Sequence, residues 1–285
     1  MSYHNHLHYC DGSGTAVEYA EAAIAAGLDS LGLSCHAPVP FPSEWNMSLE
    51  SLPAYCAEVR AAQEMYRGRL QILLGVELDY LSLDLVPQST AFQQHIFSHH
   101  LDYVVASVHF VGRDPSGAPW TIDWTEESFS HQLEAVYRGD IQALVEEYYR
   151  HVVAMAEVAP QWGLPVIVGH LDKIKMWNFQ GRYFPEDAPW YKASVETALQ
   201  AIREAGLVLE INTAGLRTEH GEPYPAPWIL RRSSELGIPV TISSDAHTPD
   251  DVVAQFPEAL ALLRDVGYTS VAVLDGRHWN LKPLP

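Results

Sequence analysis

Helical patterns and short apolar runs alternate along this chain, and the alternation constrains the fold more than any other feature. Each helical pattern closes on a glycine that an apolar run follows within a few residues. These glycines are Gly27, Gly68, Gly163, Gly206, Gly237 and Gly267. Glycine commonly ends a helix because it adopts the left-handed backbone conformation at little cost. Helices that alternate with apolar strands predict an α/β fold in which helical crossovers join parallel strands.

Seven segments are predicted as strands, and several are short apolar runs typical of strands buried on both faces. They are Tyr3–Leu7, Ser30–Cys35, Ile72–Glu77, Tyr103–His109, Val166–His170, Val208–Asn212 and Val240–Ser244. Seven strands favour a closed or nearly closed barrel, although the pattern alone also permits an open, doubly wound sheet. The chain of 285 residues has a length at which such barrels fold as one unit, so we expect a single domain over residues 1–285.

Three helices and one long loop are predicted from local signals. Apolar residues at three- and four-residue steps predict a helix over Asp140–Trp162. Thr15 and Glu18 have the spacing of a capping box, so a helix is expected to begin at Thr15. Thr248 before Pro249 predicts another helix start. The segment Val111–Glu126 is predicted as an irregular loop over the barrel mouth.

Composition excludes several classes of function. The 17 basic and 36 acidic residues give a formal charge of −19, which disfavours nucleic-acid binding because phosphate backbones are held by cationic side chains. The N-terminus lacks the apolar stretch of a signal peptide, and no apolar run is long enough to span a membrane. The three cysteines form no C-x-x-C pair, which favours free thiols. We therefore expect a cytoplasmic protein without nucleic-acid or membrane partners; the sequence leaves its oligomeric state open.

Histidines and acids gather where the predicted strands end. They are His4, His6, His36, Glu77, His109, His170, Asp245 and His247. In a barrel of parallel strands these ends meet at one face, where the active sites of such enzymes lie. The sequence therefore predicts one cluster of imidazoles and carboxylates at the barrel mouth.

The residue types in this cluster predict a metal centre. Imidazole and carboxylate together suit zinc, manganese or iron. The set exceeds the four ligands of one tetrahedral ion, so two or three divalent metals are expected, with Glu77 as the best bridging carboxylate. Such centres ionise water near neutral pH and stabilise the oxygens of a reacting ester, a need that is greatest in phosphate esters.

At these positions the chain resembles the polymerase-and-histidinol-phosphatase (PHP) family. The matching motifs are His4-Asn-His6, Cys10-Asp11-Gly12, His36-Ala-Pro, Gly75-Val-Glu77, Ser107-Val-His109, Gly169-His170-Leu-Asp, Asn212-Thr-Ala-Gly-Leu-Arg217 and Ser244-Asp245-Ala-His247. The stretch Asn212–Arg232 resembles the monofunctional histidinol-phosphate phosphatases of that family. The resemblance implies a distorted (β/α)7, TIM-like barrel, two or three metals, and dephosphorylation of L-histidinol phosphate in histidine biosynthesis.

The resemblance also implies a set of metal ligands in this chain, although the chain differs from many relatives at two positions. The implied ligands are His4, His6, Asp11, His36, Glu77, His109, His170, Asp245 and His247. Relatives often carry a third N-terminal histidine, for which this chain offers Asp11 or His8; we expect Asp11, together with His36 and His247. Many relatives also have aspartate where this chain has Cys35.

Further residues are expected to act on the substrate. Arg217 is predicted to clamp the phosphate, since a guanidinium can bind it bidentately, and Lys173 and Lys175 are placed to approach the same group. Asp123 is the expected counter-charge for the cationic end of the substrate. Glu77, Asp245, His247 and Arg217 form the expected catalytic set. One or two of the tryptophans in the mouth loops are expected to contact substrate: Trp45, Trp120, Trp124, Trp177 and Trp228.

Two other functions fit parts of the pattern. Amidohydrolase barrels also open with His-x-His, but they usually carry a metal-bridging lysine on the fourth strand, where this chain has Ser107-Val-His109. A metal-stabilised accessory domain without turnover is the second alternative; against it, the ligand set is nearly intact and no polymerase is attached.

Overall fold

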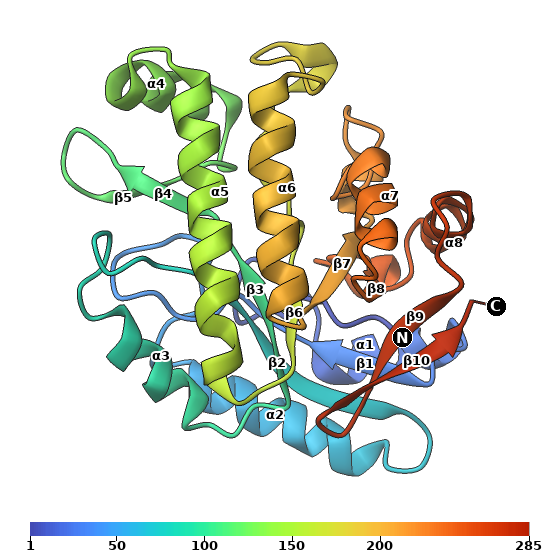
Figure 1. The fold of residues 1–285 in the computed structure, drawn as a ribbon. Coiled ribbons are helices and arrows are strands. Elements are labelled where there is room, and N and C mark those ends of the chain that lie inside the picture. The colour runs from blue at the N-terminus through green and yellow to red at the C-terminus, as the bar shows by residue number, and fades with distance from the viewer. Residues whose placement is uncertain (285) are drawn as a thin grey trace.

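The computed structural model describes residues 1–284, and its centre is a curled parallel sheet of six strands (Figure 1). The strands follow one another around the sheet in chain order. They are β1 (Ser30–Leu33), β2 (Gln71–Asp79), β3 (Tyr103–Ser107), β6 (Val166–Val168), β7 (Val208–Asn212) and β8 (Val240–Ser243). The predicted α/β class is confirmed, and the curled sheet is consistent with a TIM-like barrel.

The first of the seven predicted strands, Tyr3–Leu7, does not form a regular strand. Residues 2–7 form no ladder; they make isolated parallel bridges from Ser2 to Leu31 on one side and from Asn5 to Ala246 on the other. Backbone bonds from Ser34 to Asn5 and from His6 to Ala246 hold the segment on its two sides, while the amide N–H of Asn5 bonds Oγ of Ser34 and that of Leu7 bonds Sγ of Cys35. The segment therefore links β1 to the chain after β8 without forming a regular strand.

Eight α-helices connect and cover the strands. They are α1 (Ala16–Ala25), α2 (Leu52–Met65), α3 (Ser89–Phe97), α4 (Glu126–Tyr137), α5 (Ile141–Val158), α6 (Pro189–Glu204), α7 (Pro227–Glu235) and α8 (Phe256–Asp265). The long helices α5 and α6 pack side by side over the sheet (Figure 1). Within the described residues, no helix is long and apolar enough to cross a membrane.

The local helix signals were right in two places and held only for a 3-10 turn in the third. Thr15 caps α1 with both hydrogen bonds of a capping box, and Asp140 caps α5, which continues into a 3-10 turn at Ala159–Trp162. Thr248 precedes only a short 3-10 turn, Pro249–Asp251. The following helix starts at Phe256, because Gln255 takes a left-handed backbone conformation that separates the two.

Two antiparallel hairpins stand outside the main sheet. The expected irregular loop over Val111–Glu126 is instead largely a hairpin of β4 (Phe110–Arg113) and β5 (Pro119–Thr121), followed directly by α4. The second hairpin, β9 (Ser270–Asp275) and β10 (His278–Pro283), lies beside the N-terminus (Figure 1). It packs Leu274 and Trp279 against Tyr3 and so covers part of the apolar core.

Candidate metal centre

Side chains from the carboxyl ends of the strands meet with Asp11 in one cluster, which is buried except at Asp11 and His247. Their donor atoms form four overlapping groups, and within each group all donors lie within 4.8 Å of one another. The groups are His6, Asp11, His36 and His247; His4, His170 and Asp245; His4, His6 and Glu77; and His36, Glu77 and His109. The structure thus brings together every residue of the expected ligand set.

Glu77 lies at the centre of the cluster. Its Oε2 is 2.9 Å from Nδ1 of His36 and 3.1 Å from Nε2 of His4, while its Oε1 is 2.9 Å from Nε2 of His170. The residue extends from β2, whose register pairs it with Val105 of β3. One carboxylate therefore faces imidazoles on two sides, which is the geometry that a bridging ligand needs.

Asp245 forms the second junction of the cluster. Its Oδ1 lies 3.1 Å from Nε2 of His6 and 3.5 Å from Nε2 of His4, and Asn212 donates a hydrogen bond of 3.1 Å to Oδ2. Asp245 has a φ of 53°, a left-handed conformation that a residue with a side chain seldom adopts. Such backbone strain commonly occurs where a side chain must point into a functional site.

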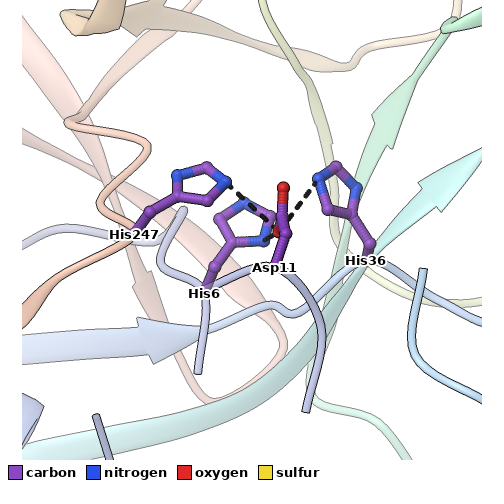
Figure 2. Close-up of side chains that lie close together, drawn as sticks. All are labelled: His6, Asp11, His36 and His247. Atoms are coloured by element: carbon purple, nitrogen blue, oxygen red, sulfur yellow. Dashed lines mark ion pairs between the residues drawn. The ribbon is translucent and has the colours of Figure 1, made fainter. Parts of the chain in front are cut away.

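Asp11 faces three histidines (Figure 2). Its Oδ1 is 3.3 Å from Nε2 of His247, 3.8 Å from Nε2 of His36 and 3.9 Å from Nδ1 of His6. His8, the competing residue, turns away: its ring bonds the carbonyl of Gly14, and its side chain is 46% exposed. Of the two, the structure places only Asp11 in the cluster.

Glycine at position 12 makes this placement of Asp11 possible. A Cβ atom there would lie 2.1 Å from the carbonyl oxygen of His6, which is far inside van der Waals contact. The chain can therefore fold back over His6 only without a side chain at residue 12.

The buried donor atoms fit divalent metals. Nε2 of His4, Nε2 of His6, Nδ1 of His36 and Oε2 of Glu77 have no hydrogen-bond partner, although they lie close together. A buried polar atom without a partner is costly, so native proteins satisfy such groups or use them as ligands. Nitrogen and oxygen atoms that converge at such short distances can direct their lone pairs toward a shared cation.

Charges inside the cluster reinforce this interpretation. Burial alone would raise the pKa of Glu77, yet His36, His4 and His109 hold that pKa well below its ordinary value. Burial would lower the pKa of His36, but Glu77 and Asp11 raise it to about 10. The acids therefore stay anionic, and the cluster needs positive charge, from protons or from metals.

Three further residues, to which the sequence assigned no role, support the ligands. Glu210 accepts a hydrogen bond of 2.9 Å from Nδ1 of His4 and another from the amide of His170. Asp79 bonds Nδ1 of His109 at 2.7 Å, and Ser107 donates to Glu77 at 2.7 Å. Such partners fix the ring orientation of ligating histidines. A signal did exist, because Asp79 lies two residues from Glu77 on its strand and so shares its face.

A cavity of about 190 Å³ opens onto the cluster. Lys173 and Asp123 both line it, and Oδ2 of Asp123 lies 3.8 Å from Nζ of Lys173 and 3.8 Å from Nε2 of His109. Burial opposes the charge of Lys173, but Asp123 raises its pKa, so the ammonium persists. Lys173 also lies over the ring of Tyr224, with Nζ 5.4 Å from the centroid.

Other expected substrate contacts lie outside this cavity. Arg217 is not among its lining residues; its guanidinium donates to the carbonyl of Ser244, next to Asp245. Lys175 is fully buried and pairs with Glu222 and Asp172. Among the tryptophans named above, Trp45 and Trp124 line the cavity, whereas Trp120, Trp177 and Trp228 do not.

The PHP domain matches residues 2–214, which is most of the chain and includes the first seven of the ligand positions. The chain belongs to the PHP domain family. This PHP protein is 36% identical over 284 residues to a probable histidinol-phosphatase of Deinococcus radiodurans, covering 98% of this chain and 97% of the relative. It is 31% identical over 261 residues to the histidinol-phosphatase of Bacillus subtilis, covering 87% and 94%.

Solved structures show the same fold. A Listeria monocytogenes protein assigned as a histidinol phosphatase matches with a TM-score of 0.74 and 24% identity, over 90% of this chain and 98% of the other. The histidinol phosphate phosphatase of Lactococcus lactis, solved with zinc, L-histidinol and phosphate, matches with a TM-score of 0.68 and 22% identity, over 98% of each chain. At these identities the likeness establishes the fold.

Proposed function

We propose that this PHP protein hydrolyses L-histidinol phosphate to L-histidinol and phosphate in histidine biosynthesis. The observation that carries the proposal is the cluster around Glu77 and Asp245, both of which line a cavity that also contains Lys173. The cavity volume of about 190 Å³ lies below the usual range for drug-sized ligands, which favours a small substrate. Two relatives above 30% identity carry the name of this activity.

The ligand set divides into overlapping sites for two or three divalent ions of zinc, manganese or iron. In this proposal the groups around Glu77 and Asp245 would hold two of the ions, and Asp11 would complete a third position with His36 and His247. When bound, such ions supply the charge that ionises a water and stabilises the attacking and leaving oxygens. The zinc in the Lactococcus lactis structure supports zinc as one of them.

The chain's own residues hold the substrate. Lys173 donates hydrogen bonds to phosphate oxygens, and Asp123 orients the ammonium of Lys173. Asp123 also provides the negative charge opposite the cationic end of the substrate. His247, which is 38% exposed, is proposed as a catalytic residue at the open side of the cluster. Arg217 is proposed as a second phosphate contact. The alternative is a structural role, in which its guanidinium only holds the carbonyl of Ser244.

We further propose that residues 1–285 work as one domain in the cytoplasm, and that residues 2–7 serve as the seventh member of a distorted barrel. Support for the barrel comes from the bridges that these residues make to Leu31 and to Ala246, on both sides of the segment.

A panel of phosphomonoesters tests the function. Metal-replete protein should release phosphate from L-histidinol phosphate with a higher kcat/KM than from other alkyl and aryl phosphates. Treatment with a chelator should abolish the activity, and added zinc, manganese or iron should restore it. Full activity after complete metal removal, or a marked preference for another ester, would contradict the proposal.

A further inference from the structure

We propose that Trp45 and Trp124 form an aromatic wall that selects substrates carrying a flat ring, and that the imidazole of histidinol phosphate packs against it. The inference rests on the proposed function for the identity of that ring. It names the residues that distinguish this substrate from other phosphomonoesters.

The two indoles belong to a stack that is anchored in the core. Trp45 lies parallel to buried Phe110 of β4, with ring centroids 5.6 Å apart and planes 14° apart. Trp124 continues the stack on Trp45 at 5.5 Å and 24°. Phe41 meets Phe110 edge-on at 5.0 Å. Ring contacts therefore hold Trp45 in place from below, and Trp45 in turn supports Trp124.

Trp124 ends this stack and is 51% exposed. The other mouth tryptophans have structural roles: Trp120 is buried, Trp177 donates to the carbonyl of Ile122, and Trp228 packs edge-on against Tyr191. A half-exposed indole beside a cavity offers apolar area that a bound ring can cover, and covering it is favourable.

The rest of the cavity lining is polar or charged. Apart from Trp45 and Trp124, its described lining residues are acids, histidines and Lys173. The phosphate end of a substrate is attracted to Lys173 and to cations in the cluster, so its organic end must meet the indoles. A flat ring stacks on an indole face, and an imidazolium gains further from the electron-rich ring.

The test compares two substrates that differ only in the ring. L-Alaninol phosphate has the phosphate and ammonium of L-histidinol phosphate but lacks its imidazole. Trp124→Leu should raise KM for histidinol phosphate about fivefold to tenfold, as expected for the loss of one aromatic contact, with a smaller change in kcat. For alaninol phosphate kcat/KM should stay within about twofold. Trp124→Phe keeps a ring and should retain most of the preference.

Trp162→Leu is the matched control, because Trp162 packs on Phe97 and does not line the cavity. It should leave both substrates unaffected. Metal content and circular dichroism should match the wild type in every variant, which separates recognition from folding. Equal losses on both substrates, or none, would overturn the aromatic wall.

The wild-type enzyme separates this inference from the proposed function. If it hydrolyses other phosphomonoesters but not histidinol phosphate, the proposed function fails. The wall is then tested with benzyl phosphate against ethyl phosphate in the same variants: selective loss of the benzyl ester in Trp124→Leu supports the wall, and equal effects overturn it.

Discussion

Oδ1 of Asp11 lies 3.3 Å from Nε2 of His247, so residues near the two ends of the chain meet at one site. The ring of His247 also stacks on that of His6, with centroids 4.2 Å apart and planes 14° apart. The N-terminal turn and the segment after β8 thus depend on each other for their positions.

Asp11→Ala should remove one metal ion per chain, because the group around His36 and His247 loses its only carboxylate. His8→Ala should keep the wild-type metal count, since His8 bonds Gly14 away from the cluster. Elemental analysis of both purified variants decides the matter. The reverse result would assign the third position to His8.

Glu77→Gln should lower metal content and reduce turnover by more than about 100-fold, since the change removes the charge that several ligands share. Glu64→Gln, an exposed surface change, is the control and should behave as wild type. Activity at the wild-type level in Glu77→Gln would show that this carboxylate does not bridge.

Arg217→Ala distinguishes two roles. If Arg217 contacts phosphate, inhibition by inorganic phosphate should weaken by about 1.5–3 kcal/mol at unchanged metal content. If it only braces the carbonyl of Ser244, phosphate inhibition should stay the same while metal retention by Asp245 declines. Arg277→Ala is the control, because Arg277 also donates to a backbone carbonyl, that of Gly163.

Asp123→Asn should raise KM for histidinol phosphate and scarcely change it for an uncharged aryl phosphate, if Asp123 counters the cationic end of the substrate. Asp123 also lies 3.8 Å from Lys173. An equal rise in KM for both substrates would therefore mean that Asp123 acts by orienting the ammonium of Lys173. Steady-state kinetics on the two esters separate these outcomes.

Metal binding should release protons at neutral pH. In the metal-free protein Cys10 and Asp245 raise the pKa of His6 to about 9 against the effect of burial, and Glu77 and Asp11 raise that of His36 to about 10. These raised values stabilise the metal-free fold fully below about pH 6.5, and the contribution is lost as pH rises through 9 to 10. Metal affinity should therefore increase from pH 7 to 9.

Titration calorimetry in buffers of different ionisation enthalpy measures the protons released per ion. Binding that releases no protons at pH 7 would contradict the raised pKa values.

The sequence alone indicated the fold class and the metal chemistry. Glycine-closed helices and apolar runs are local patterns, and parallel strands necessarily place their carboxyl ends together, so the strand-end candidates from His4 to His247 could be gathered without coordinates, and the family resemblance added Asp11. Capping residues such as Thr15 and Asp140 also act locally, and their helices start where expected.

Tertiary structure decided what depends on contacts between distant segments. Residues 2–7 combine backbone bonds to neighbouring segments with amide bonds to the side chains of Ser34 and Cys35, a mixture that no period-two pattern reveals. Only packing turned His8 outward and Asp11 inward, put Arg217 against Ser244, and left Trp45 and Trp124 at the cavity. The sequence determines which side chains could ligate metal or bind substrate, because that ability depends on the type of residue. The directions of these side chains and the distances between them are set only when the backbone folds.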